Sequence, residues 1–237
     1  KQIMISVDTV YQTVLALANK EQRGYITPQE FNLYADQAQM TTFEQYFYDL
    51  NQFKRVPGND SSYADMVNLI EDKISIFKKG PTDIGDGNQL NAPSAGRAGF
   101  YRVTDVFNTS YDKLVEQVKS EDIYKTQYSP LTKATTNRPV YYIKDGNIYF
   151  LPTGGQFQIN WIRKPKAPKW SYIVVNEKPL YDGGGTGTGG QDFELHPSEQ
   201  TELVVKILQL AGVTIKDLNL TQIAAQEEVK NIQQEKQ

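Results

Sequence analysis

The chain has 237 residues, and its 28 acidic and 25 basic side chains give a net charge of −3. Residues of the AVILMFWYC set make up 39%, and with the 17 glycines this share is usual for a globular protein that buries a core. The small net charge excludes a protein that coats nucleic acid through its overall charge. The absence of cysteine excludes disulfides, thiolate metal sites and cysteine nucleophiles.

No apolar run reaches the ~20 residues that a membrane-spanning helix needs. We therefore expect a soluble protein that contacts no membrane. The 15 Tyr, 10 Phe and 2 Trp are a large aromatic supply for a chain of this charge. Because aromatic side chains are enriched in protein interfaces, the composition favours extensive contact surfaces.

Two helices are predicted near the start of the chain. The apolar residues between positions 6 and 19 recur at three- and four-residue spacing, which is typical of one helix face. Thr27-Pro28-Gln29-Glu30 has the pattern of a capping box with proline in the first turn, and it predicts a second helix that runs to about Leu50. Residues 21–25 would form the turn of this helical hairpin.

The stretch that follows has mixed signals. Residues 61–79 predict a third short helix, but Ile74 and Ile76 alternate with polar residues, so a strand stays open for its second half. Residues 81–99 are rich in Gly, Pro, Asn and Asp, which predicts a loop. The predicted N-terminal helical part is therefore 1–80, followed by a loop over 81–99.

An antiparallel β region is predicted over 100–180. Residues 100–107 alternate like a strand, and 113–119 form either a second strand or a short helix. The clearest local pattern is a hairpin, in which two alternating runs flank Asp145-Gly146. Residues 157–163 supply another strand, and the proline-rich residues 164–170 predict an edge or an extended arm.

The last part of the chain predicts a glycine-rich loop over 181–194 and helices over 195–237. Pro197 would open an apolar helix that Gly212 ends. A last helix from Val213 would have only a thin apolar stripe, so it would need the helical body or a neighbour to pack against. The predicted fold class is α+β, a helical body with an inserted antiparallel β region.

The sequence predicts no catalytic residue, no cofactor and no metal site. His196 precedes a helix start without the frame of a catalytic triad, so a capping or surface role is favoured. Residues 83–88 lack the spacing and the closing Glu of a calcium loop, and no Lys follows the glycines of 183–190 as a phosphate loop requires. A hydrolase that uses two of the 28 carboxylates stays open as an alternative.

Two groups of residues are predicted to contact partners. The first group interleaves basic and aromatic side chains, which suits either a protein interface or a nucleic-acid-binding module, although core packing would also explain the aromatics. The second group is the apolar stripe of the last helix. The members of the first are Trp161, Arg163, Lys164, Trp170 and Tyr172, and those of the second are Leu218, Ile223 and Ile232.

Several segments of the chain also resemble a known group of proteins. Arg138-Pro139, the Asp145-Gly146-Asn147 turn, Leu151-Pro152 and the run from Trp161 to Trp170 resemble, in order and spacing, virion structural proteins of tailed bacteriophages. The similarity is to crAss-like and marine short-tailed phages especially. The N-terminal hairpin, from Val10-Tyr11-Gln12 through Thr27-Pro28-Gln29-Glu30, looks like the opening of the same proteins. Together these segments cover roughly half of the chain.

The resemblance implies a subunit of the head-to-tail connector, an adaptor ring that joins the portal to the tail and helps to form the DNA channel. It implies a homo-oligomeric ring, expected to be dodecameric, with the portal protein and adjacent tail or connector rings as partners and packaged DNA passing through. The implied location is the virion, assembled in the bacterial host cytoplasm, and the implied function is not enzymatic. Another virion or tail structural component is the alternative within the same group.

Overall fold

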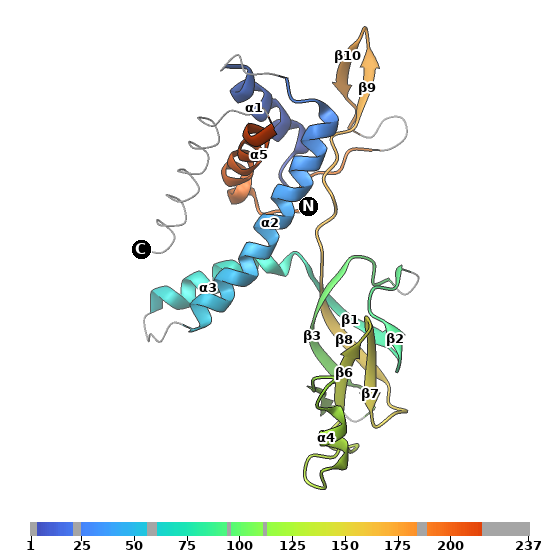
Figure 1. Cartoon of the computed structure of the whole chain (residues 1–237). Coiled ribbons are helices and arrows are strands. Elements are labelled where there is room, and N and C mark those ends of the chain that lie inside the picture. The colour runs from blue at the N-terminus through green and yellow to red at the C-terminus, as the bar shows by residue number, and fades with distance from the viewer. Residues whose placement is uncertain are drawn as a thin grey trace. The chain divides into compact units, whose positions relative to one another are not determined.

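The computed structural model describes residues 4–20, 25–55, 61–93, 96–110, 113–183 and 189–214. It contains both helices and largely antiparallel sheets, which confirms the predicted α+β class. The chain divides into two compact units, shown within Figure 1. The helical unit consists of Lys1–Ile76 and Pro165–Gln237, and the β unit consists of Phe77–Lys164.

The predicted N-terminal helices are both present. Helix α1 spans Val7–Lys20, and α2 spans Pro28–Arg55, which is longer than predicted. The capping box is confirmed, because the main-chain N–H of Thr27 donates to Glu30 Oε2 at 3.0 Å and the N–H of Glu30 donates to Thr27 Oγ1 at 3.3 Å.

Residues 61–79, for whose second half the sequence leaves helix and strand open, form a helix that is followed by the start of a strand. Helix α3 spans Ser61–Ser75, and strand β1 (Lys78–Ile84) follows it and pairs with a strand late in the β unit. A two-residue strand, β2 (Asn88–Gln89), comes next. The prediction of a loop throughout 81–99 is therefore wrong. The exposed Lys, Gly and Pro residues of β1 do not follow the alternating pattern of a strand. They adopt the strand conformation because they pair with another strand.

Two four-stranded sheets form the β unit. Besides β1 and β2 they contain β3 (Phe100–Asn108), β4 (Lys113–Leu114), β5 (Glu116–Gln117), β6 (Val140–Lys144), β7 (Asn147–Leu151) and β8 (Phe157–Arg163). One sheet has the order β1-β8-β3-β4, and the other has the order β2-β7-β6-β5. Neighbouring strands are antiparallel except β5 and β6, which are parallel.

The two sheets are joined along both edges. The chain passes from β1 to β2 at one edge and from β4 through Val115 to β5 at the other, so the pairing follows a barrel-like circuit. Helix α4 (Ile123–Tyr128) lies between β5 and β6. The predicted hairpin is confirmed as β6 and β7, with φ of 52° at Asp145 and 74° at Gly146, as a tight hairpin turn requires.

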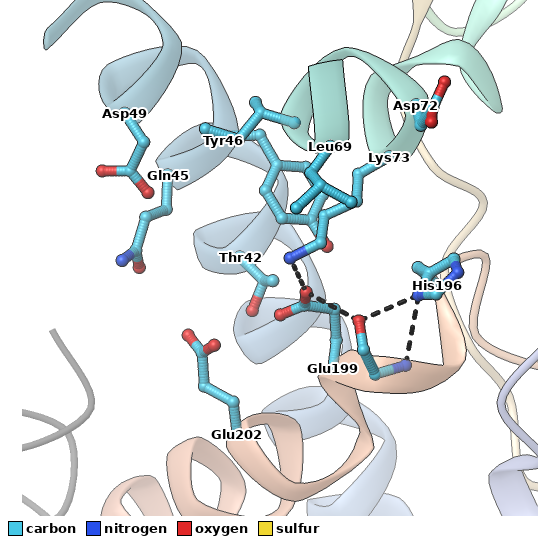
Figure 2. Close-up of a pocket in the computed structure, with 12 residues that line it drawn as sticks. Thr42, Gln45, Tyr46, Asp49, Leu69, Asp72, Lys73, His196, Glu199 and Glu202 are labelled. Atoms are coloured by element: carbon cyan, nitrogen blue, oxygen red, sulfur yellow. Dashed lines mark hydrogen bonds and ion pairs between the residues drawn. The ribbon is translucent and has the colours of Figure 1, made fainter. Parts of the chain in front are cut away.

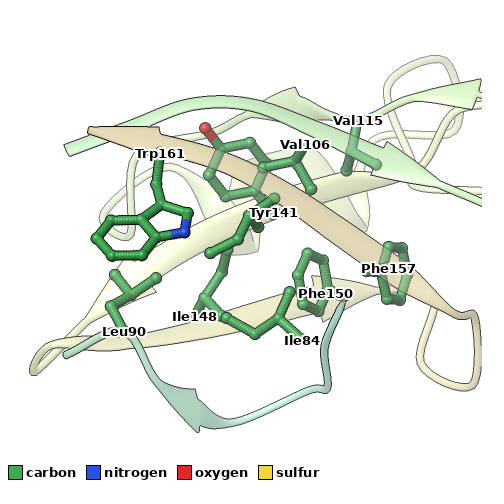
Figure 3. Close-up of a cluster of buried hydrophobic side chains, with 10 residues drawn as sticks. Ile84, Leu90, Val106, Val115, Tyr141, Ile148, Phe150, Phe157 and Trp161 are labelled. Carbon is green, nitrogen blue, oxygen red and sulfur yellow. The ribbon is translucent and has the colours of Figure 1, made fainter. Parts of the chain in front are cut away.

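The inner faces of these sheets enclose one apolar core (Figure 3). Phe150 and Phe157 stack within it, with ring centroids 3.8 Å apart. Arg97, which is only 2% exposed, supports the corner between β1 and β2: its guanidinium donates to the carbonyl oxygens of Asp83, Gln89 and Leu90. The core consists of Ile84, Leu90, Val106, Val115, Tyr141, Ile148, Phe150, Phe157, Ile159 and Trp161.

After the β unit the chain returns to the helical unit. A second hairpin, β9 (Tyr172–Val175) with β10 (Lys178–Tyr181), belongs to this unit, so the predicted boundary of the β region at residue 180 is wrong. A short 3-10 helix, η2 (Pro197–Glu199), leads into α5 (Gln200–Thr214). Helix α5 continues through Gly212, where an end was predicted. The predicted last helix, with Leu218, Ile223 and Ile232, lies outside the described residues.

Helix α2 organises the helical unit. It packs against α3 and α5, and α5 also packs against α1. The returning chain is held by side-chain amides of α2: Gln39, fully buried, donates to the main-chain oxygen of Lys166 at 2.8 Å and accepts from the main-chain N–H of Glu194 at 3.0 Å. The core of the unit includes Val10, Tyr11, Val14, Phe31, Ala35, Phe43, Leu203 and Ile207.

Candidate interaction surfaces

The first predicted contact group is divided between the two units. Trp161 is 3% exposed and lies in the core of the β unit, where its Nε1 donates to Thr82 Oγ1 at 3.2 Å and its ring lies 5.9 Å from that of Phe100. Its burial is the core packing that the sequence left open as an alternative. Trp161 therefore presents no ring face to a partner in this structure.

Trp170 is buried in the helical unit. Its Nε1 donates to Asp8 Oδ1 at 2.9 Å, and its ring centroid lies 4.4 Å from that of Tyr11. Tyr172, half-buried, stacks on it at 5.7 Å and Tyr181 at 5.8 Å. The two tryptophans thus belong to different compact units, and both are buried there.

The basic members of that group lie at the end of β8. Arg163 is half-buried, with its guanidinium carbon 5.7 Å from the centroid of the Phe77 ring. Lys164 is exposed, and its main-chain N–H donates to the carbonyl oxygen of Gly99 at 2.6 Å. Contact of Arg163, Lys164 and Tyr172 with a partner stays a prediction, as does contact of Leu218, Ile223 and Ile232.

The hairpin of β9 and β10 carries a contiguous exposed apolar surface within the helical unit. We call Ile173, Val174, Val175 and Leu180 the hairpin surface; their exposed fractions are 46%, 66%, 43% and 51%. Successive side chains of a strand point to opposite faces, so both faces of β9 are exposed. A two-stranded sheet by itself is only marginally stable in water. This hairpin would be stabilised if its exposed apolar side chains packed between other protein surfaces.

The two edges of this hairpin differ. Its turn consists of Asn176 and Glu177, both with positive φ (50° and 63°), and the register pairs Val175 with Lys178 and Val174 with Pro179. In a two-residue hairpin the pair that flanks the turn is hydrogen-bonded, so the main-chain groups of the next pair point outward. Pro179 has no N–H there, whereas Val174 has one. The outer edge of β9 is therefore the better acceptor of an added strand.

This hairpin is not among the elements predicted from the sequence. A β-branched run, Ile173-Val174-Val175, was present as a signal. The sequence does not predict the turn, because Glu177 is not a residue that usually takes positive φ. A second exposed apolar group, in the β unit, consists of Tyr124, Tyr128 and Leu131, with exposed fractions of 71%, 83% and 93%.

A pocket of about 380 Å³ lies within the helical unit, among α2, α3, η2 and the start of α5 (Figure 2). Lys73 Nζ binds Glu199 Oε1 at 2.5 Å and lies 5.7 Å from the centroid of the Tyr46 ring. The hydroxyl of Ser198 also contacts Glu199 Oε1, at 3.3 Å. The carboxylates of Asp49, Asp72, Glu199 and Glu202 line the pocket, together with Leu69 and Ile70.

His196 has the capping role that the sequence favoured. Its Nδ1 accepts from the main-chain N–H of Ser198 at 3.3 Å, at the start of η2, and lies 2.8 Å from Ser198 Oγ. The nearby carboxylate of Glu199 contacts the serine and not the histidine, so the order of a catalytic triad is not reproduced. Within the described ranges, no cluster of three or more Asp, Glu or His side chains is arranged to hold a metal ion.

Charge is divided unequally between the two units. The β unit, residues 77–164, has 12 Lys and Arg against 8 Asp and Glu, a net charge of +4. The helical unit has the remaining 13 basic and 20 acidic residues, a net charge of −7. The net charge of the whole chain is thus small although its β unit is basic and its helical unit is acidic.

A scan against models of known protein families finds none that matches this chain, and a search of curated proteins finds no similar sequence. Among the helices that the structure describes, none combines the length and apolarity that crossing a membrane requires.

Proposed function

We propose that this protein is a structural subunit of a bacteriophage head-to-tail connector ring, which joins the portal to the tail and helps to form the DNA channel. Its partners would be further copies of itself, the portal protein and adjacent connector or tail proteins, and its location would be the virion. The resemblance of residues 138–170 and of the N-terminal helical hairpin to phage virion proteins supports this proposal, and so does the exposed apolar surface of the chain.

The observation that carries the proposal is the hairpin surface. Three consecutive β-branched residues, Ile173 to Val175, are left exposed on a hairpin that pairs with no third strand among the described residues. Contiguous exposed apolar side chains mark contact sites in proteins that function in assemblies. A ring subunit meets two neighbours through different surfaces, and an exposed hairpin is suited to reach one of them.

Nucleic-acid binding is the second candidate, and the net charge of +4 on the β unit favours it. The burial of Trp161 and Trp170 counts against a binding mode in which residues 161–172 stack on bases. We propose no enzymatic activity. The contacts of His196 and Ser198 are those of a helix cap, which counts against a catalytic triad at this histidine.

Electron microscopy of the native assembly, averaged with rotational symmetry, tests the proposal. A closed ring of this chain stacked on a portal-like body is expected, whereas single scattered copies would contradict the ring. In parallel, Ile173→Thr, Val174→Thr and Val175→Thr together should abolish incorporation, because threonine keeps the strand preference but lowers the apolar area. Leu33→Thr on α2, where Leu33 is 71% exposed, is a control for the loss of one exposed apolar side chain outside the hairpin.

A further inference from the structure

We infer that copies of this chain join by strand addition: β9 of one copy pairs antiparallel with an open edge of β3 in another copy, and the Val174 side chain enters the pocket beside that edge. The inference rests on the proposed function, assembly with further copies, and deepens it by naming the two surfaces that meet. One surface lies in the helical unit and the other lies in the β unit.

The outer edge of β3 is open over part of its length. Strand β4 pairs only with the last two residues of β3, and the N–H of Val115 extends this pairing to the carbonyl oxygen of Val106 at 2.9 Å. At the other end, the side-chain oxygen of Asn91 accepts from the N–H of Phe100 at 3.4 Å. Between Phe100 and Val106, no strand of the described residues pairs with this edge.

Val103 directs its main-chain N–H and C=O to this open edge. The main-chain groups of successive residues in a strand point to alternate edges. In β8 the N–H of Arg163 donates to the carbonyl oxygen of Phe77 at 3.0 Å, on the β1 side, so Trp161, two residues earlier, faces β1 as well. Because Trp161 thus faces away from β3, the main-chain groups of its partner Val103 point away from β8.

The length of the open edge suits a short strand. The register of β3 with β8 shifts between Phe100 and Arg102 and again between Val103 and Asp105, so a bulge lies on each side of Val103. Bulges interrupt an edge and prevent the pairing of a long flat strand. Strand β9 has four residues, which match the stretch that is left.

A pocket of about 440 Å³ lies beside this edge, among β2, β3, β5 and β6. Phe100, Val103 and Ile143 give it apolar walls, and all three pack against the core of the β unit. A residue that pairs directly with Val103 places its side chain on the same face of the sheet, next to these walls. An apolar side chain at that position would therefore be removed from water.

Strand β9 supplies an edge and a side chain that fit this site. The main-chain groups of Tyr172 and Val174 point outward from the hairpin. The Tyr172 ring is stacked on Trp170, whereas Val174, nearer the turn, is 66% exposed. Pro179 pairs with Val174, so the two apolar side chains lie together on the face that would enter the pocket.

The occupant is a second copy because one chain carries both halves of the contact. Among the described strands, β9 pairs with β10 alone. A strand of a different protein would fill the pocket but would leave the hairpin surface exposed, whereas pairing between copies covers both surfaces in one contact. A two-fold exchange of hairpins and a head-to-tail ring both satisfy this pairing, and they differ in how many copies are linked.

Cysteine cross-linking of the full chain tests the contact, since the sequence has no cysteine of its own. Directly paired residues have Cα atoms about 5.5 Å apart, which suits a disulfide. Chains with Val103→Cys and chains with Val174→Cys, one of them enlarged by an affinity tag, are mixed and oxidised, and the mixed dimer is measured on a non-reducing gel. Ile173→Cys replaces Val174→Cys in the matched control, because the Ile173 side chain points to the opposite face of the hairpin.

The mixed dimer of Val103→Cys with Val174→Cys should form roughly tenfold or more in excess of the control. A chain that carries both changes then separates the two closures. A ladder of covalent oligomers would support a head-to-tail ring. Covalent dimers alone would show a two-fold exchange, which keeps the strand contact and contradicts the proposed ring.

The main-chain part of the contact has its own variant. Val174→Pro removes the outward N–H and leaves the hydrogen bonds within the hairpin, as Pro179 does in the opposite strand. Self-association measured by sedimentation velocity should be roughly tenfold weaker for Val174→Pro than for Val174→Ala, which shortens the side chain but keeps the N–H.

A mixed dimer that forms no more than the control would overturn the inference. So would a disulfide that forms only within the single chain carrying both cysteines, or equal association of Val174→Pro and Val174→Ala. Symmetric rings on virions built from the Val174→Pro chain would leave the proposed function standing without this contact. Mixed dimers together with virions that lack such rings would do the reverse.

Discussion

The side-chain amide of Asn32 forms a reciprocal pair of hydrogen bonds with the main chain of Trp170. Asn32 Nδ2 donates to the carbonyl oxygen of Trp170 at 3.3 Å, and Asn32 Oδ1 accepts from the N–H of Trp170 at 2.7 Å. The side-chain amide thus satisfies the main-chain N–H and C=O groups of Trp170, as the main chain of a neighbouring strand would. Gln39 binds the same returning chain two helical turns further along α2, so one helix face fixes its path.

Asn32→Ala should lower the free energy of unfolding of the helical unit by about 2 kcal/mol, because it leaves the main-chain groups of the buried Trp170 without partners. Urea unfolding followed by Trp170 fluorescence in a Trp161→Phe background measures the change, with that background as reference. Gln37→Ala, at an exposed position of the same helix, should cost less than about 0.5 kcal/mol. Equal effects of the two changes would contradict the role of the amide.

Arg97→Ala should destabilise the β unit by about 3 kcal/mol, because three main-chain oxygens lose their donor and a cavity is left at the corner between β1 and β2. Burial lowers the pKa of this guanidinium, and the structure compensates with hydrogen bonds to carbonyl oxygens. Trp161 fluorescence in a Trp170→Phe background reports the unfolding of this unit. Arg97→Lys should recover only part of the loss, since one ammonium lacks the forked geometry; full recovery would contradict the need for a guanidinium.

Lys206 offers a double-mutant test within the helical unit. Its ammonium is buried and donates to Glu202 at 2.6 Å, Gln45 at 3.1 Å and Thr42 at 3.3 Å. Lys206→Met should cost about 3 kcal/mol because it leaves Glu202 without its cation, and adding Glu202→Gln should return about 1 kcal/mol or more. Chemical denaturation of the four proteins of the cycle measures the coupling. Strictly additive losses would show that the two side chains do not interact.

The capping box gives the stability of α2 a dependence on pH. The pKa of Glu30 is lowered, chiefly by the main-chain N–H of Thr27 and next by the Thr27 hydroxyl. Because the folded pKa lies below the unfolded one, this stabilisation is present above the unfolded pKa and is lost as pH falls through the folded pKa.

Thr27→Val should therefore raise the pKa of Glu30 only part of the way to its ordinary value, since the main-chain donor remains. An NMR titration of the Glu30 carboxyl carbon measures the shift. In a Glu30→Gln background the effect of Thr27→Val on stability should no longer change between acid and neutral pH. An unchanged Glu30 pKa in the single variant would rule out a contribution from the hydroxyl.

The local elements could be predicted because their causes lie within a few residues. The capping box joins Thr27 to Glu30, and the turn at Asp145-Gly146 needs only the residues that tolerate positive φ. The apolar spacing of α1 and α2 likewise needs no knowledge of the rest of the chain. These features are decided by sterics and hydrogen bonds at short sequence separation, and the structure confirms them.

The composition and order of residues by themselves determined the α+β class, the N-terminal helical hairpin and the β6–β7 hairpin, and they favoured a capping or surface role for His196. Only the tertiary structure decided that Lys78 to Ile84 form a strand, that Trp161 and Trp170 are buried in different units, and that the charge divides into +4 and −7. The physical reason is that strand pairing, burial and surface charge depend on residues far apart in the chain. The pairing of β1 with β8 encloses Trp161, and the amide of Asn32 holds Trp170, so neither outcome is present in the local sequence.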